Sequence, residues 1–105
     1  MEITVSGRHV EVTPAIKTYA TDKVSKLPRY FDRVHAINVV VDRNDSHSFN
    51  VEIIVTAEHH DKFVGKVSSA DMYACIDGAV DKLERQLTDF KEKSRAKKGR
   101  TPTAG

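Results

Sequence analysis

The strongest hydrophobic pattern in the chain lies in residues 71–93 and repeats with the period of an α-helix. At about 100° per residue, the apolar positions fall into one stripe along the predicted helix. They are Met72, Ile76, Ala79, Val80, Leu83, Leu87 and Phe90. Ser68, Ser69 and Asp71 precede the stripe and can cap the first turn. We therefore predict a long amphipathic helix that buries this stripe.

The charged residues of the same segment are sorted onto two flanks. Asp77, Asp81 and Glu84 lie on one side of the stripe. The opposite side carries Gly78, Lys82, Arg85, Gln86 and Lys93, interrupted by Asp89. Scattered pairs of opposite charge would be enough for solubility, so sorted flanks favour a basic side that faces a polyanion. The alternative is an amphipathic helix whose polar side faces only water.

A shorter helix is predicted after Thr13. This threonine can act as the N-cap, and Pro14 suits the first helical position because its missing N–H has no helical partner there. Apolar residues then recur at helical spacing, at Ile16, Ala20, Val24 and Leu27. The residue before a proline avoids helical angles, so Pro28 predicts that the helix ends near Lys26.

The remaining apolar segments have the composition of strands. Ile3 and Val5 alternate with polar residues in a short first strand, and Gly7 can turn the chain after it. Residues 37–41 and 49–57 are rich in β-branched residues and predict a hairpin. The last strand is residues 62–67, and the turns between strands lie at Asn44 and Asp45 and at His59, His60 and Asp61.

These elements follow the order strand, helix, three strands, helix. A strand–helix–strand crossover makes the first two strands parallel, whereas hairpins make the later ones antiparallel. Each helix needs an apolar surface to cover, so both should pack on one face of the sheet. The predicted fold is α+β, β-α-β-β-β-α, with two helices on one face of a four-stranded mixed sheet. Double-stranded-RNA-binding domains share the order helix, three strands, helix, which is a likeness of fold and not of function.

The charge is unevenly divided along the chain. We predict one domain in residues 1–93 and a basic, disordered tail in residues 94–105. This tail carries Arg95, Lys97, Lys98 and Arg100 and no acid, so the net charge of +2 leaves −2 for the domain. Binding of nucleic acid by the domain therefore needs a local basic patch, to which the tail could add phosphate contacts. The alternative is a tail that only improves solubility.

Composition excludes several classes of protein. No apolar run approaches the roughly 18 residues that cross a membrane, and the start of the chain lacks the features of a secretory signal. A single cysteine, Cys75, rules out an internal disulfide. We expect a cytoplasmic protein with no membrane partner that is monomeric when free.

Residues suited to catalysis or metal binding are few. The neighbouring His59 and His60 would point to opposite faces of a strand, so they would not chelate one ion. Cys75 has no base nearby in the sequence that could activate it. The chain also lacks a glycine-rich phosphate loop. We therefore predict no catalytic residues, no metal, no cofactor and no small-molecule substrate, and hence a protein that is not an enzyme.

The basic residues around the two helices are better candidates for function. Lysine and arginine suit phosphate contacts, which position a protein on RNA without reading its sequence. The predicted RNA-binding residues are Lys23, Lys26, Arg29 and Arg33 in and after the first helix, and Lys82, Arg85 and Lys93 on the second. We expect side-by-side helices to place them on one surface, with the acidic flank facing away. Tyr30 and Phe31 could stack on a base or close the core.

Two segments resemble the ribosome hibernation promoting factor family, whose members are also called ribosome-associated inhibitors and sigma-54 modulation proteins. They are VEVTPAIKTYATDKVSKLPRYFDRV in residues 10–34 and DMYACIDGAVDKLERQLTDFKEK in residues 71–93. The resemblance covers nearly the whole chain through Lys93, including the spacing between the two segments.

This resemblance implies a bacterial protein that binds the small ribosomal subunit and its ribosomal RNA, in the channel where messenger RNA and the A- and P-site transfer RNAs would lie. Occupying that channel would inhibit translation in resting or stressed cells by steric occlusion. The family's basic helix surface corresponds to Lys23, Lys26, Arg29, Lys82, Arg85 and Lys93. Asp71 and Tyr73 also match the family motif.

The end of the chain departs from the family pattern. Long members continue into a second domain that pairs two ribosomes, and some short members end in an acidic extension, whereas this chain ends in basic residues. We expect the short form, which leaves open whether ribosome dimers form or single ribosomes are silenced. Two other functions stay in consideration: a general double-stranded-RNA-binding protein, and a protein-interaction modulator of a transcription factor.

Overall fold

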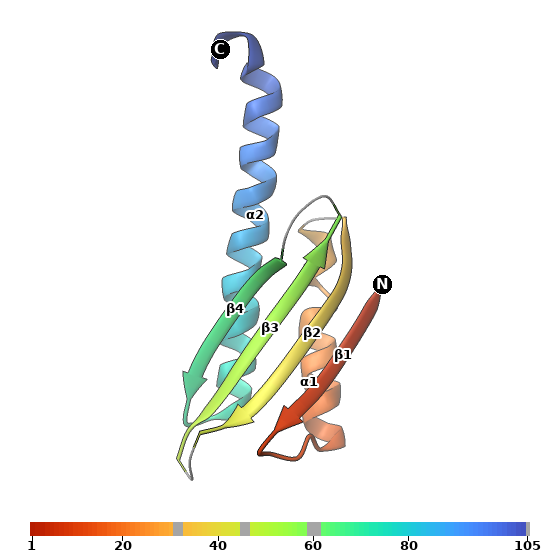
Figure 1. Ribbon diagram of the computed structural model, residues 1–105, viewed down its shortest axis with the longest axis vertical. Coiled ribbons are helices and arrows are strands. Elements are labelled where there is room, and N and C mark those ends of the chain that lie inside the picture. The colour runs from red at the N-terminus through yellow and green to blue at the C-terminus, as the bar shows by residue number, and fades with distance from the viewer. Residues whose placement is uncertain (31–32, 45–46, 59–61, 105) are drawn as a thin grey trace.

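The computed structural model describes residues 1–30, 33–44, 47–58 and 62–104, with side chains described through Glu92. Its elements are β1 (Glu2–Arg8), α1 (Pro14–Val24), a short 3-10 helix η1 (Leu27–Arg29), β2 (Val34–Arg43), β3 (Phe49–Ala57), β4 (Lys62–Ser69) and α2 (Met72–Ala104). The predicted order β-α-β-β-β-α is therefore confirmed (Figure 1).

The strands form one mixed sheet in the order β1-β2-β3-β4. β1 and β2 pair in parallel because the crossover through α1 returns the chain in the same direction, and the two later pairs are antiparallel hairpins. Both helices lie on the same face of this sheet (Figure 1). α1 packs on β1, whereas α2 packs on β3 and β4. The predicted α+β class is confirmed.

The core lies between the sheet and the two helices and is wholly apolar. Alternate residues of β2 and β3 point into it, as the period of a strand requires. The predicted stripe of α2 is buried from Met72 to Leu87, with Phe90 partly buried at its end. Among the described residues, no polar or charged side chain is buried. Every charged side chain among these residues therefore reaches the surface.

Gly7 does not turn the chain as predicted but lies within β1, where it pairs with Val41. The strand continues through Arg8 because the parallel pairing with β2 extends that far. The turn follows at His9, whose φ of 56° lies in the left-handed region. A Cβ at Gly7 would collide with the carbonyl oxygen of Val10, so glycine is needed there for close approach of the returning chain.

The predicted helix ends are confirmed at their caps. Thr13 Oγ1 accepts a hydrogen bond from the backbone N–H of Ile16 at 3.2 Å, and Pro14 is the first residue of α1. α1 ends at Val24, close to the predicted Lys26, and Pro28 lies within η1. At the start of α2, Asp71 Oδ1 accepts from the N–H of Tyr73 at 3.0 Å.

Replacing Asp71 with alanine should lower the free energy of unfolding by about 1 kcal/mol, because the freed N–H of α2 loses its acceptor. Urea denaturation followed by circular dichroism measures the change. Asp71→Asn is the matched control, since asparagine caps a helix about as well as aspartate. Equal destabilisation by alanine and asparagine would show that the cap hydrogen bond contributes nothing.

The backbone of α2 continues through Ala104, past the domain boundary predicted at residue 93. The division of the chain at that point, and the use of residues 94–105 as a phosphate-binding tail, stay predictions. The side chain of Lys93 and the predicted turns at Asp45 and at residues 59–61 lie outside the described residues.

Candidate nucleic-acid interface

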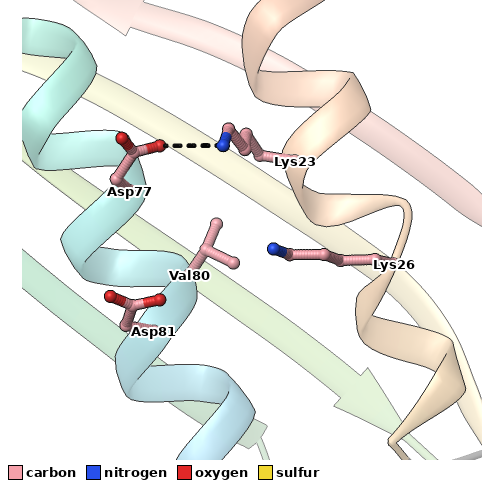
Figure 2. A pocket seen from close by; sticks show the side chains of 5 residues that line it. All are labelled: Lys23, Lys26, Asp77, Val80 and Asp81. Atoms are coloured by element: carbon pink, nitrogen blue, oxygen red, sulfur yellow. Dashed lines mark ion pairs between the residues drawn. The ribbon is translucent and has the colours of Figure 1, made fainter.

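The acidic flank of α2 faces α1, and two of its carboxylates meet lysines across the groove between the helices. Lys23 Nζ lies 3.6 Å from Oδ1 of Asp77, and Lys26 Nζ lies 3.7 Å from Oε1 of Glu84. Figure 2 shows both lysines extending toward α2. The expectation that this flank faces away from the predicted RNA-binding lysines is therefore wrong.

Each of these carboxylates also accepts a hydrogen bond from a tyrosine. The Tyr19 hydroxyl donates to Asp77 Oδ1 at 2.7 Å, and the Tyr30 hydroxyl donates to Glu84 Oε1 at 3.1 Å. These hydrogen bonds raise the pKa of both tyrosines, because an ionised phenol could not donate to the carboxylate. Both hydroxyls thus stay protonated. We call the two groups, Tyr19 with Asp77 and Lys23, and Tyr30 with Glu84 and Lys26, the interhelical clusters.

A pocket of about 220 Å³ opens between the helices, lined by Lys23, Lys26, Asp77, Val80 and Asp81 (Figure 2). With Glu84 beside it, the three carboxylates of the acidic flank outnumber the two ammonium groups. The pocket and its two ion pairs therefore offer a polyanion little net positive charge while the lysines stay in them. A polyanion would gain attraction here only from lysines that leave their carboxylates.

Burial of the apolar stripe sets which flank of α2 faces α1, and the charges of the two helices are complementary there. Lys23 and Lys26 project toward the neighbouring helix, so the basic flank in that position would bring like charges together. Aspartate and glutamate instead give ion pairs between partly exposed side chains, each worth about 0–1 kcal/mol. The pairs add little stability, but they avoid repulsion at the helix contact.

Lys82 lies on the opposite side of α2 and is separated from the α1 lysines by that helix. Its ammonium group donates to the backbone carbonyl of Lys66 at 2.8 Å, and the Gln86 amide donates to the carbonyl of Val64 at the same distance. Both acceptors belong to β4. The basic flank of α2 therefore covers β4, and the prediction that Lys82 shares one surface with Lys23 and Lys26 is wrong.

Three predicted arginines are exposed and accessible. Arg29 ends η1, and Arg33 lies directly before β2. At about 100° per residue, Arg85 points about 160° away from the buried Leu83, so it lies on the outward side of α2. Within the described part of the chain, none of these guanidinium groups forms an ion pair. They are the cations most available to a phosphate.

The aromatic residues near the groove have structural contacts. Tyr30 is partly buried against the core, which favours the core role over base stacking, while Phe31 lies outside the described residues. Tyr73 is 40% exposed and meets the Tyr19 ring edge to face, with centroids 4.8 Å apart. A half-exposed tyrosine ring beside the groove offers a face on which a base could stack.

Other chemistry has little support in the described residues. No group of histidine, cysteine, aspartate and glutamate side chains among them could hold a metal ion. Burial raises the pKa of the Cys75 thiol, which keeps it protonated and a poor nucleophile. None of the described helical segments has the combination of length and apolar character needed to cross a bilayer.

Sequence reasoning did not identify Tyr19, Asp77 and Glu84 as partners of the lysines. One signal was present, because Asp77 and Glu84 are seven residues apart and so lie on one face of a helix, about two turns from each other. That spacing does not indicate which element packs against this face of the helix. The partners are more than 50 residues away along the chain.

The chain matches the family model described as sigma 54 modulation protein / S30EA ribosomal protein over residues 3–95. The ribosome hibernation promoting factor of Escherichia coli strain K12 is 39% identical over 95 residues, covering 89% of this chain and 96% of the relative. The factor of the same name from Klebsiella oxytoca is 38% identical over 96 residues, with the same two coverages of 89% and 96%.

Solved structures show the same arrangement of helices and sheet. The N-terminal domain of Protein Y from Thermus thermophilus superposes with a TM-score of 0.76 at 35% identity, over 86% of this chain and 99% of that domain. A ribosomal subunit interface protein from Coxiella burnetii gives a TM-score of 0.79 at 24% identity, over 88% and 99%, and supports the fold alone. With a family model that spans almost the whole described domain, this chain belongs to the sigma 54 modulation protein / S30EA ribosomal protein family.

Proposed function

We propose that this protein is a ribosome hibernation factor that acts without catalysis. It binds the small ribosomal subunit in the channel for messenger RNA and the A- and P-site transfer RNAs, and inhibits translation by occupying that channel. The observation that carries this proposal is the alignment with relatives named ribosome hibernation promoting factor, which covers 96% of the relative's length. Such coverage leaves no part of those relatives to supply a separate activity.

The geometry supports a surface that binds ribosomal RNA through its phosphates. Arg29 and Arg33 follow α1, and Arg85 lies on the outward side of α2. Arginine forms paired hydrogen bonds with phosphate oxygens, so these residues give firm contacts that do not depend on base sequence. Lys23 and Lys26 add two further phosphate contacts when their side chains move out of the groove between the helices. Lys82 supplies further positive charge at the margin, and we propose that Lys93 and the basic residues after it add phosphate contacts.

The test is cosedimentation with purified small subunits as the salt concentration rises. With about six phosphate contacts, the logarithm of the binding constant should fall against the logarithm of the salt concentration with a slope of about −4. Large subunits and a free RNA duplex serve as controls. Binding that ignores salt, or that is equally tight on the large subunit, would refute the proposal. Equal affinity for the free duplex would instead favour a general double-stranded-RNA-binding protein.

A further inference from the structure

The two interhelical clusters repeat one arrangement. In each, a single carboxylate oxygen of α2 receives a tyrosine hydroxyl and faces a lysine ammonium group. Asp77 and Glu84 are about two helical turns apart, so the arrangement recurs along the groove. The same pattern at two successive positions indicates a common role for the carboxylates.

The tyrosine and the lysine of each cluster are held differently. The hydroxyls donate from part-buried rings, Tyr19 at 2.7 Å, a usual length for such a hydrogen bond, and Tyr30 at a slightly long 3.1 Å. The ammonium groups lie at 3.6 and 3.7 Å, beyond the roughly 2.7–2.9 Å of a charge-assisted hydrogen bond. Each tyrosine therefore fixes its carboxylate, and each carboxylate holds its lysine loosely. Lys23 has one further contact, because its Nζ lies 5.3 Å from the centroid of the Tyr19 ring.

The lysines also have room to leave. The Lys23 and Lys26 side chains are 38% and 39% exposed, and they border the pocket of about 220 Å³ between the helices. A lysine that moves out leaves its carboxylate with the tyrosine hydroxyl and with water. Its departure costs little, since an exposed ion pair is worth about 0–1 kcal/mol, and the contact of Lys23 with the Tyr19 ring adds about 0.5–1 kcal/mol.

We propose that Asp77 and Glu84 set the affinity of this protein for RNA by competing with phosphates for Lys23 and Lys26. In the free protein the carboxylates hold the two ammonium groups in the groove. On RNA, each phosphate takes a lysine from its carboxylate, and the tyrosine keeps that carboxylate in place. Asp77 and Glu84 are thus positioning residues that weaken binding to any polyanion by the strength of the ion pairs. This inference rests on the proposed RNA-binding role of the two lysines.

Replacing Asp77 with asparagine should therefore tighten RNA binding. The amide oxygen can still accept from the Tyr19 hydroxyl, but the charge that holds Lys23 is lost. We expect the dissociation constant to fall about twofold to fivefold at low salt, corresponding to an exposed ion pair of about 0.4–1 kcal/mol. Small ribosomal subunits and a single-stranded oligouridylate are the two probes, measured by filter binding and fluorescence anisotropy.

Two controls separate competition from a general gain in positive charge. Glu11→Gln removes the same charge from an exposed residue between β1 and α1, outside both interhelical clusters, so it reports long-range repulsion. The second control makes the same Asp77→Asn change in a Lys23→Met background. Competition requires Lys23, so the gain should vanish in that background, as a double-mutant cycle can measure. Circular dichroism confirms that each variant is folded.

The outcomes are distinct for the two probes. A gain that persists without Lys23, an equal gain from Glu11→Gln, or no gain on either probe would overturn the inference. If the wild-type protein binds the oligouridylate but not the small subunit, the proposed ribosomal function fails. The competition is then still decided by the oligouridylate measurements, because it applies to phosphates of any polyanion.

Discussion

Replacing Gly65 with valine should lower the free energy of unfolding by about 3 kcal/mol, near the upper end of the range for extra methyl groups forced into a packed core. Gly65 lies on β4, where α2 crosses the sheet. A Cβ at this position would lie 2.8 Å from the carbonyl oxygen of Ala79 and 3.2 Å from Leu83 Cγ. The first of these atoms belongs to the helix backbone, so relief requires that α2 move off the sheet.

Gly78→Ala on the facing surface of α2 is the matched control. Its Cβ would meet the methyl groups of Val67 at 3.3 and 3.4 Å, which are contacts that a side chain can relieve. Alanine also favours a helix over glycine by about 1 kcal/mol. We expect this variant to stay within about 1 kcal/mol of the wild type in urea denaturation.

The sign of the change in the free energy of unfolding of Gly65→Val distinguishes close packing from loose packing of α2. Valine is a better strand residue than glycine, so a loosely packed helix would allow the substitution to stabilise β4. Unchanged or raised stability would show that α2 does not approach the sheet this closely. Circular dichroism and tyrosine fluorescence can both follow the unfolding transition. The chain has three tyrosines and no tryptophan that would mask their emission.

Reversing the charge of Arg29 and Arg33 together, as Arg29→Glu with Arg33→Glu, should weaken binding to small ribosomal subunits by at least about 100-fold. Each hydrogen bond to a charged group is worth about 1.5–3 kcal/mol, and the new carboxylates add repulsion from the phosphates. The slope of the salt dependence should also become shallower by about 2. Inhibition of translation in a cell-free extract should be lost in parallel.

The matched control is Arg8→Glu with Arg43→Glu, which makes the same change in net charge elsewhere. Arg8 and Arg43 end β1 and β2, whereas Arg33 precedes the first residue of β2. The length of β2 places Arg33 and Arg43 about 30 Å apart, at opposite ends of the sheet. Urea denaturation checks both pairs for folding. An equal loss of binding from both would mean that net charge, and not a defined surface, determines the affinity.

Most of the fold could be predicted because its signals are local. Thr13 and Pro14 fix the start of α1 through one cap and one proline, and the stripe of α2 needs only the helical period. Gly7 could not be assigned in the same way. A glycine marks either a turn or a close approach of two chain segments, and the choice depends on the loop that returns against β1.

The sequence allowed the exposed basic residues to be predicted, but not how they are arranged relative to one another in space. Exposed arginines such as Arg29 and Arg85 follow from their position beside apolar helical stripes. The side of α2 that faces α1 instead depends on how both helices pack on the sheet, and this places Asp77 opposite Lys23 and sends Lys82 to β4. The sequence shows two flanks of opposite charge on α2, but tertiary contacts decide which element lies beside each flank.

The hydrogen bonds from Lys82 and Gln86 also oppose the pairing of β4 with a strand of another copy of the chain. β4 is an edge strand, and the bare carbonyls of such a strand are a template on which another chain can build aggregates. Here the carbonyls of Val64 and Lys66 already have donors from α2. An incoming strand would have to displace both side chains before it could pair. The β4 edge thus resists aggregation at high protein concentration without a proline or a bulge to interrupt the strand.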